Sequence, residues 1–555
     1  MQDFAELIER LILTPQRNGK LRLIADHFRT TPDPDRGWAL AALTGALDFR
    51  HAKPGLVRGL VEERVDPVLF RLSYDYVGDL SETVSLIWPA PEQETGGQEA
   101  IALPPSLSQV VTFLSETPRA QMPDLVAAML DRLDETGRWA FLKLITGGLR
   151  IGVSARLAKT AVAMLANETS PDTDAIEDVW HGLEPPYESL FAWLEGHAGK
   201  PVSDNPAPFR PAMLAHPIED DDFGKLDPAD YAAEWKWDGI RVQAVCGTDR
   251  HGHVIRRLYS RTGEDISETF PDLLEALNFT GAIDGELLVV RQGRVQPFND
   301  LQQRLNRKTV TKKLMDSHPA HLRAYDVLAL EGDDLRGASF QDRRTELEAL
   351  VGALSSPNID LSPKVAFGDW DELGSARADP ASHGAGDDAD AVEGIMLKRH
   401  DSPYVSGRPK GPWFKWKRDP YTVDAVMMYA QRGHGKRSSF YSDYTFGVWR
   451  TGDEGEELVP VGKAYSGFTD VELKKLDKHV RQNTVDRFGP VRAVKADAES
   501  GLVLEIAFEG LNRSTRHKSG VAMRFPRIAR IRWDKPPAEA DRIEMLETLL
   551  PRSDS

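Results

Sequence analysis

Cysteine is almost absent from this chain of 555 residues, because Cys246 is the only one. A single cysteine excludes an internal disulfide and any zinc site built from several thiolates, and it is typical of a reducing cytoplasm. We interpret Cys246, which lies in an alternating apolar stretch, as a small core residue.

Long apolar runs are also missing. No stretch approaches the ~20 apolar residues that span a bilayer. The first residues, MQDFAELIERLIL, carry acids where a secretory signal needs a basic flank. With 41% hydrophobic and 28% charged residues, the composition is ordinary for a globular protein. We therefore expect a cytoplasmic protein with no membrane partner.

Positive charge is in deficit, since 69 Lys and Arg face 86 Asp and Glu, for a net charge of −17. This balance argues against a nucleic-acid partner, because Lys and Arg drive phosphate binding. The deficit is uneven: the net charge is −10 over residues 1–200, −9 over 201–420 and +2 over 421–555. Residues 297–324 carry six basic and two acidic side chains, and residues 501–537 carry eight and three. Basic faces can therefore exist on an acidic chain.

The length predicts several domains, at ~100–200 residues for each. The first part reads as helical, with one apolar helix stripe formed by Phe4, Leu7, Ile8, Leu11 and Ile12. A stretch rich in Pro, Gly and Asp over 196–231 reads as a linker, and strand-like runs follow it. Beyond Asp419 and Pro420, several short strands suggest a small barrel or sandwich closed by a helix. We predict three domains, over residues 1–200, 201–420 and 421–555.

One short block, EWKWDGIR from Glu234 to Arg241, carries the sharpest chemical signal. It places Lys236 two residues before an Asp-Gly turn, and a lysine amine can act as a covalent nucleophile when its surroundings deprotonate it. A surface turn is the alternative, and the block alone does not decide between them. Five further blocks follow in order: LYSRTGED (258–265), AIDGELLV (282–289), RAYDVLALEGDDLRG (323–337), VEGIMLKR (392–399) and WFKWKRD (413–419).

These six blocks resemble, in their order, the motifs of the covalent nucleotidyltransferases, which include ATP-dependent DNA ligases, RNA ligases and mRNA capping enzymes. The resemblance implies that Lys236 attacks the α-phosphate of ATP and becomes lysyl–AMP, with Asp238 as a second catalytic residue. It implies ATP contacts from Glu234, Arg241, Arg261, Glu286, Tyr325, Lys398, Arg408, Lys415 and Lys417.

The resemblance also assigns roles within this set. Arg241 and Arg261 would hold ribose and phosphate, and Tyr325 would offer a flat face to the purine. Lys398, Lys415 and Lys417 would neutralise the triphosphate. Glu286 and Glu393 would hold Mg²⁺, or Mn²⁺ in its place, and a ribose hydroxyl is the alternative partner of these carboxylates. Taken singly, Glu286 could instead be a solvated strand end, and Tyr325 a core aromatic.

The C-terminal part carries another resemblance, because residues 513–536 are similar to the last ligase motif. Its Arg-x-Asp-Lys corresponds to Arg532 through Lys535, and an Arg-Phe-Pro-Arg segment precedes it from Arg524 to Arg527. The resemblance implies an OB-fold barrel in which Arg532 and Lys535 orient pyrophosphate and which then turns, so that Arg524 and Arg527 grip DNA. A generic basic patch is the alternative, and it too predicts a polyanion partner.

The N-terminal part is similar, over 141–162, to the helical DNA-binding domain of archaeal and eukaryotic replicative ligases. In such a domain, glycine-rich turns before helices present backbone N–H groups to phosphates. Lys143, Arg150 and Arg156 could add charge there. The alternative is a buried helix pair joined by a glycine turn.

Together these resemblances imply a three-domain ATP-dependent DNA ligase that seals nicks between a 5′-phosphate and a 3′-hydroxyl in duplex DNA, in replication, repair or recombination. Its fold would combine an all-α DNA-binding domain, an α/β adenylation domain of mainly antiparallel sheets, and a C-terminal OB-fold. ATP is favoured over NAD, since NAD-dependent ligases carry a four-cysteine zinc module. We expect nicked DNA as partner, a monomer, and association with the nucleoid in a bacterium. An RNA-joining enzyme of the same superfamily and a non-catalytic DNA-binding protein on a ligase scaffold are the alternatives.

Overall fold

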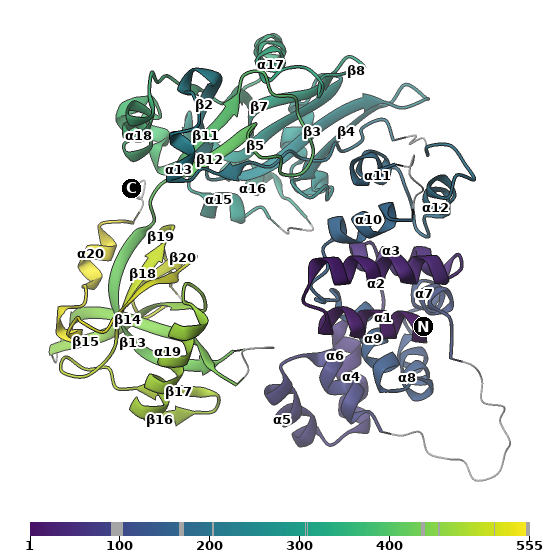
Figure 1. The fold of residues 1–555 in the computed structure, drawn as a ribbon, viewed down its shortest axis with the longest axis horizontal. Helices are drawn as coiled ribbons and strands as arrows, with labels where there is room; N and C mark the ends of the chain where they lie inside the picture. The colour runs from purple at the N-terminus through teal and green to yellow at the C-terminus, as the bar shows by residue number, and fades with distance from the viewer. Residues whose placement is uncertain are drawn as a thin grey trace.

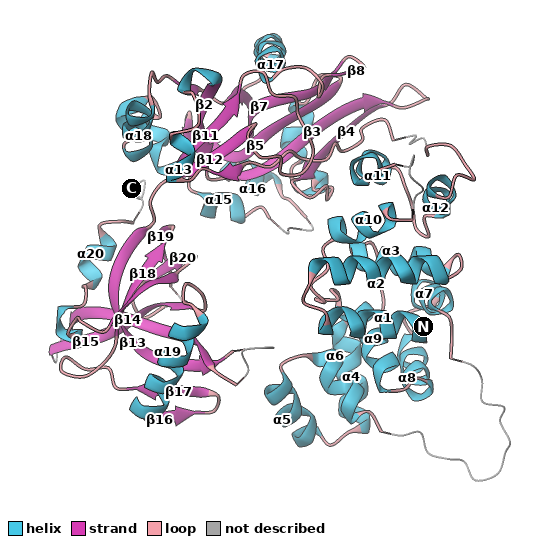
Figure 2. Cartoon of the chain, in the orientation of Figure 1, coloured by secondary structure: helices cyan, strands magenta, loops and turns pink. Residues whose placement is uncertain are grey.

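The computed structural model describes residues 1–89, 104–165, 171–201, 205–305, 307, 309–433, 439–452, 455–515 and 517–550. These residues form three regions that are arranged as an arc (Figure 1). A helical region is followed by a middle region with two sheets and by a smaller, sheet-rich C-terminal region (Figure 2). The predicted order, with helices first and sheets afterwards, is confirmed. No helix among the described residues is long and apolar enough to cross a membrane.

The helical region contains α1 (Gln2–Leu13), α2 (Arg17–Thr30), α3 (Asp35–Thr44), α4 (Pro54–Arg64), α5 (Pro67–Val77), α6 (Leu80–Ile87), α7 (Leu107–Glu116), α8 (Met122–Arg132), α9 (Glu135–Thr146), α10 (Ala155–Ala163), α11 (Thr173–Trp180) and α12 (Glu188–Leu194). One hydrophobic core joins them, with α1 packed on α9 and α2 on α10. The predicted stripe of α1 is buried at Phe4, Leu7, Ile8 and Leu11, whereas Ile12, in the last turn, is 44% exposed.

The first sheet of the middle region has the order β1-β12-β11-β2-β10. Its strands are β1 (His216–Pro217), β2 (Tyr231–Trp237), β10 (Lys364–Val365), β11 (Val392–Arg399) and β12 (Trp413–Lys417). The second sheet has the order β4-β3-β5-β7-β8, with β6 beside β5 and β9 beside β7. Its strands are β3 (Ile240–Thr248), β4 (Val254–Ser260), β5 (Gly281–Arg291), β6 (Arg294–Val295), β7 (Ala320–Leu330), β8 (Asp333–Asp334) and β9 (Ile359–Leu361).

The two sheets are tied together by both the backbone and the core. β2 ends in the first sheet and β3 begins in the second, so the two-residue turn Asp238–Gly239 crosses from one sheet to the other. A hydrophobic cluster that includes Met213, Ala329 and Trp413 draws on both sides. The helices of this region are α13 (Asp220–Phe223), α14 (Pro271–Ala276), α15 (Phe298–Gln302), α16 (Lys312–Ser317), α17 (Phe340–Leu354) and α18 (Trp370–Ala378).

The C-terminal region contains β13 (Tyr421–Arg432), β14 (Tyr441–Gly452), β15 (Gly455–Ala464), α19 (Asp470–Asn483), β16 (Thr484–Phe488), β17 (Val491–Val494), β18 (Val503–Phe508), β19 (Gly510–Arg513), β20 (Val521–Arg524), β21 (Arg527–Arg532) and α20 (Ile543–Glu547). β13 pairs with β14, β17 and β18, and β21 pairs with β18. β19 and β20 form a separate hairpin. β15 contacts β20 and β21, so the curved sheet brings its ends together around one core.

Candidate active site

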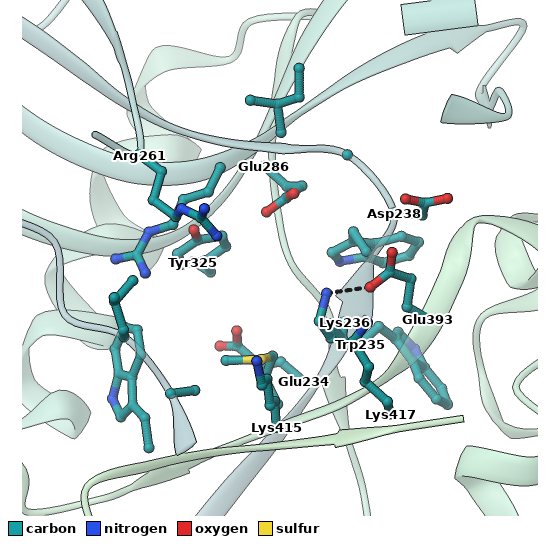
Figure 3. Close-up of a pocket in the computed structure, with 18 of the residues that line it drawn as sticks. Glu234, Trp235, Lys236, Asp238, Arg261, Glu286, Tyr325, Glu393, Lys415 and Lys417 are labelled. Atoms are coloured by element: carbon teal, nitrogen blue, oxygen red, sulfur yellow. Dashed lines mark hydrogen bonds and ion pairs between the residues drawn. The ribbon is translucent and has the colours of Figure 1, made fainter. Parts of the chain in front are cut away.

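A cavity of about 580 Å³ lies where the two sheets of the middle region meet. Its volume is that of an ordinary small-ligand site. Predicted site residues from several strands and loops line it together: Glu234, Lys236, Asp238, Arg241, Arg261, Glu286, Tyr325, Glu393, Lys398, Arg408, Lys415, Lys417 and Arg524. Figure 3 shows Lys236, Glu286, Tyr325 and Lys415 around one open space. We call this cavity the pocket.

Lys236 reaches the pocket because it is the second-last residue of β2, directly before the turn between the sheets. Its register partner on β11 is Gly394, so the neighbouring Glu393 lies within reach. The Nζ atom donates to Glu393 Oε2 at 2.5 Å, and each side chain is 22% exposed. The amine is thus held by a carboxylate at the edge of an open pocket, where an added group can approach it (Figure 3).

Gly239 completes the turn because no larger residue fits there. A Cβ atom at Gly239 would lie 2.6 Å from the carbonyl oxygen of Leu287 and 2.7 Å from Cγ of Glu286. Real Cβ contacts are never so short, so the turn can lie against β5 only with glycine at this position. The Lys-x-Asp-Gly spacing therefore has a steric reason, which is to bring Lys236 and Glu286 to one pocket.

Three of the carboxyl groups that line the pocket have pKa values shifted in different directions or by different amounts. Burial raises the pKa of Asp238 to about 6, although the hydrogen bond from Arg524 opposes this rise, while Glu393 adds to it. Burial raises the pKa of Glu286 to about 8, against the attraction of Lys236 and Arg241. Burial would also raise the pKa of Glu393, but Lys236 holds it below its ordinary value. Such divergent pKa values in one cleft are typical of functional sites.

Aromatic rings and buried cations form another wall of the pocket. Lys398 is 1% exposed, with Nζ 4.5 Å from the ring centre of Tyr325 and 4.8 Å from that of Trp413. Its Nζ donates to Glu234 Oε2 at 2.8 Å, and Arg344 donates to Glu234 Oε1 at 3.0 Å. Lys398 is therefore already paired with Glu234, which it shares with Arg344.

Arg241 is likewise engaged. Its guanidinium donates to Asp284 Oδ2 at 2.5 Å, to the Tyr404 hydroxyl at 2.8 Å and to the carbonyl oxygen of Met213. The bond to Met213 ties the segment before β1 to the second sheet. The guanidinium also lies 5.9 Å from the ring centre of Tyr325 and 5.7 Å from that of Trp413, so Arg241 packs against the aromatic wall.

The remaining cations lie on the open side of the pocket. Arg261, Arg408, Lys415 and Lys417 line it from β12 and from the loops after β4 and before β12. Burial lowers the pKa of Lys415, and the nearby charges of Arg408, Lys417, Lys236 and Arg261 lower it further. Like charges gathered in this way favour a polyanionic ligand such as a triphosphate.

The C-terminal region also contributes to the pocket. Arg524, the last residue of β20, forms an ion pair with Asp238, and its Nη2 lies 3.8 Å from Glu393 Oε1. Its guanidinium lies over the ring of Phe298, 4.7 Å from the centre. Lys417 Nζ donates to Glu509 Oε2 at 2.9 Å. The sequence predicts Arg524 as a DNA contact and gives no signal for Glu509 or Arg344.

Other predicted residues lie outside the pocket. Arg532 Nη1 and Lys535 Nζ both donate to Asp424 Oδ2, at 3.2 and 2.7 Å, within the C-terminal region. Arg527 lies beside Glu509, at 3.6 Å. The structure therefore does not bring Arg532 or Lys535 to Lys236.

In the helical region, Arg150 and Arg156 are exposed, and Arg156 packs against Gly407. The structure corrects the expectation for Lys143, which is 7% exposed and donates to Asp79 Oδ2 at 2.7 Å. Lys143 is thus an internal partner of Asp79 and is closed to a DNA phosphate.

A strand-end lysine paired with a carboxylate, beside an aromatic wall and a cluster of cations between two sheets, defines a nucleotidyltransferase that acts through a covalent lysyl–nucleotide. Residues 212–417 match the family described as "ATP dependent DNA ligase domain", and residues 437–535 match "ATP dependent DNA ligase C terminal region". The chain is 30% identical to the "Probable DNA ligase" of Koribacter versatilis, over 99% of this chain and 96% of that protein. It therefore belongs to the ATP-dependent DNA ligase family, as its six motifs predict.

Further similarities extend along the whole chain. "DNA ligase 1" of Korarchaeum cryptofilum is 28% identical over 99% of this chain and 98% of that protein. The solved structure named "Pmar-Lig_PreS3" covers 95% of this chain and 99% of its own, with a TM-score of 0.56 and 16% identity. At that identity the likeness concerns the fold alone.

Proposed function

We propose that this protein seals nicks in duplex DNA with ATP, through AMP bound covalently to Lys236. The observation that carries the proposal is the Lys236 amine, which lies near the end of β2 at the edge of a pocket lined by several carboxyl groups and cations. The Nζ atom attacks the α-phosphorus of ATP, the bond to the bridging oxygen of the β-phosphate breaks, and pyrophosphate leaves. The amine loses a proton, and a phosphoramidate remains.

Two transfers complete the reaction. An oxygen of the 5′-phosphate at the nick attacks the α-phosphorus, the bond to Lys236 Nζ breaks, and the amine regains a proton. The 3′-hydroxyl then attacks the activated 5′-phosphate, loses its proton and releases AMP. Nucleophilic catalysis replaces one difficult condensation by several easier steps that pass through covalent intermediates. Glu393 orients the free amine before it attacks ATP, since it accepts a hydrogen bond from Nζ.

The pocket offers a separate surface for each part of ATP. The purine stacks against Tyr325, whose wall Lys398, Glu234 and Arg241 support. Arg261, Arg408, Lys415 and Lys417 hold ribose and phosphates from the open side. Arg532 and Lys535 reach the pyrophosphate after the C-terminal region has turned. Preorganised cations of this kind stabilise the charge that develops as pyrophosphate leaves.

The carboxyl groups of Glu286 and Glu393 suit Mg²⁺, or Mn²⁺, as oxygen ligands. Among the described residues, no group of three or more His, Cys, Asp or Glu side chains could hold a metal alone. This fits a Mg²⁺ ion bound through one or two carboxylates together with substrate phosphates. Such an ion, when bound, withdraws charge from the phosphates. Glu286 must lose its proton before it can serve as a ligand.

The three regions have separate tasks in this proposal. Residues 1–200 bind duplex DNA, with Arg150 and Arg156 on the exposed loop and helix after α9. Residues 201–420 carry out adenylation, and residues 421–555 form an OB-fold that presents Arg524 and Arg527 to the nick. The hydrophobic cores change between Leu194 and Ala207, and again between Trp416 and Val423, which supports these limits. We propose that one chain acts as a monomer on nicked DNA.

Labelled ATP tests the proposal. With Mg²⁺, the wild type should retain label covalently and release it when nicked duplex DNA is added, as ligated product. Lys236→Ala should retain no label and seal nothing. A labelled Lys236→Ala variant would assign the nucleophile elsewhere, and transfer only to RNA ends would reassign the substrate.

A further inference from the structure

An ion pair joins the middle and C-terminal regions at the rim of the pocket. Lys417 ends β12 and lies in the pocket lining, and its Nζ donates to Glu509 Oε2 at 2.9 Å. Glu509 occupies the single position between β18 and β19. Arg527 approaches the other oxygen of the same carboxylate, at 3.6 Å. The side chains of Lys417 and Glu509 are 41% and 29% exposed, so the pair can open without breaking a core.

This pair occurs together with one orientation of the C-terminal region. The β19–β20 hairpin that follows Glu509 places Arg524 against Asp238 and close to Glu393. Arg532 and Lys535 are held meanwhile on Asp424, within their own region. In this orientation Arg524 is the cation that the C-terminal region supplies to the pocket, while Arg532 and Lys535 are unavailable to it.

The ion pair with Glu509 and the binding of a triphosphate compete for the ammonium group of Lys417. It belongs to the cationic wall with Lys415 and Arg408, the surface that suits phosphates. A triphosphate on this wall would bring several negative oxygens close to the Glu509 carboxylate, and like charges repel strongly at short range in a partly buried site. Bound triphosphate therefore opposes the orientation seen here, and loss of pyrophosphate favours it.

We propose that Glu509 is a positioning residue for the steps that follow adenylation of Lys236. It captures Lys417 once pyrophosphate has left, and it thereby holds the C-terminal region with Arg524 at Asp238. Glu509 touches no reacting atom in this role and acts through Lys417. The inference rests on the proposed function of the pocket, because it assigns Lys417 to the triphosphate of ATP.

Separate assays of the first and the last of the three steps, called the two half-reactions below, test this inference on the full chain. The first measures label transfer from ATP to Lys236, and the second measures sealing, without ATP, of a synthetic nick that already carries 5′-AMP. For Glu509→Gln, sealing should fall roughly fivefold, as the loss of a partly exposed ion pair of ~1 kcal/mol gives. Label transfer should be unchanged or faster, since Lys417 is released to the triphosphate. Glu509→Lys should lower sealing further, because it places two cations together.

Glu457→Gln is the matched control. This change also converts a carboxylate that pairs with an arginine, Arg450, but both partners belong to the C-terminal region and lie outside the pocket lining. It should leave both half-reactions at the wild-type rate. Equal sealing by Glu509→Gln and the wild type, or a parallel fall of both half-reactions, would overturn the inference. A wild type that retains no label would instead overturn the proposed function.

Discussion

Arg524 forms an ion pair with Asp238 across a separation of 286 residues. Asp238 belongs to the turn that carries Lys236 between the two sheets, and Arg524 ends β20 of the C-terminal region. The charge state of the turn therefore depends on where the C-terminal region lies. Because the hydrogen bond from Arg524 lowers the pKa of Asp238, removing Arg524 must raise that pKa above about 6.

Arg524→Met should shift the pH dependence of sealing. Ionised Asp238 is the form that carries a negative charge and can pair with a cation, and the wild type should lose activity as the pH falls through about 6. In the variant, the loss should begin at higher pH. Rates of sealing between pH 5 and pH 8.5 measure the midpoint. Arg450→Met, which breaks an ion pair far from Asp238 in the sequence, should keep the wild-type midpoint, and an unshifted midpoint in Arg524→Met would contradict the prediction.

Glu286 should make stability depend on pH. Its pKa is about 8 in the folded chain and 4.5 in the reference state, so between these values the folded state holds a proton that the unfolded state lacks. Its contribution is therefore full below pH 4.5 and is lost as the pH rises towards 8. Glu286→Gln should gain stability relative to the wild type by at least ~1.4 kcal/mol, the value of one pKa unit, on going from pH 4.5 to pH 8.5.

Melting temperatures of the wild type and Glu286→Gln at both pH values measure this gain. Glu275→Gln, on the exposed face of α14, provides the matched control and should show no such difference between the two pH values. A constant gap between the wild type and Glu286→Gln would show that the Glu286 carboxyl group is not protonated in the folded chain at neutral pH.

Gly239→Ala should impair adenylation more than stability. The added methyl group would overlap the carbonyl oxygen of Leu287, so the turn and Lys236 would have to move. Overpacking of this kind costs ~1–3 kcal/mol, while a small displacement of a nucleophile lowers its rate by roughly 100-fold. Label transfer and thermal melting separate the two effects. Gly352→Ala, in α17 with open space around it, should leave label transfer intact, and normal transfer in Gly239→Ala would contradict the steric argument.

DNA binding should be modest and sensitive to salt, because the chain carries a net charge of −17. If the helical region binds phosphates, Arg150→Gln should reduce the slope of log affinity against log salt by about one. Lys143→Met should leave that slope unchanged, since Lys143 is buried against Asp79. Titration of nicked and intact duplexes at several salt concentrations measures both slopes. Tight, salt-resistant binding to intact duplex would contradict this picture.

Local motifs predicted the pocket well because each motif places a side chain on a strand or strand end that borders it. Register on β2 and β11 brings Glu393 to Lys236, and the Asp238–Gly239 turn carries the chain to β3, whose Arg241 pairs with Glu286 on β5. Apolar periodicity also predicted that the first region is helical and that the middle and C-terminal regions are rich in strands.

Contacts between residues that are far apart in the sequence could not be predicted by such reasoning. Glu509 and Lys417 are 92 residues apart, and Lys535 and Asp424 are 111 apart, so no local pattern links them. The burial of Lys143 could not be predicted either, because a buried lysine and an exposed lysine look alike in the sequence. Lys143 is buried in the structure, where α9 packs against α6. Tertiary packing and the placement of whole regions decided these cases.

The connection between the middle and C-terminal regions is short. β12 ends at Lys417 and β13 begins at Tyr421, and Arg377 pairs with Asp419 in between, at 3.0 Å. A tether of three residues lets the C-terminal region rotate but keeps it from moving far away. Short tethers give effective local concentrations in the ~mM range. Arg524 therefore binds at the pocket as part of the same chain, at this effective concentration. A free peptide that copies the β19–β20 hairpin would need a concentration in the same range to compete with it.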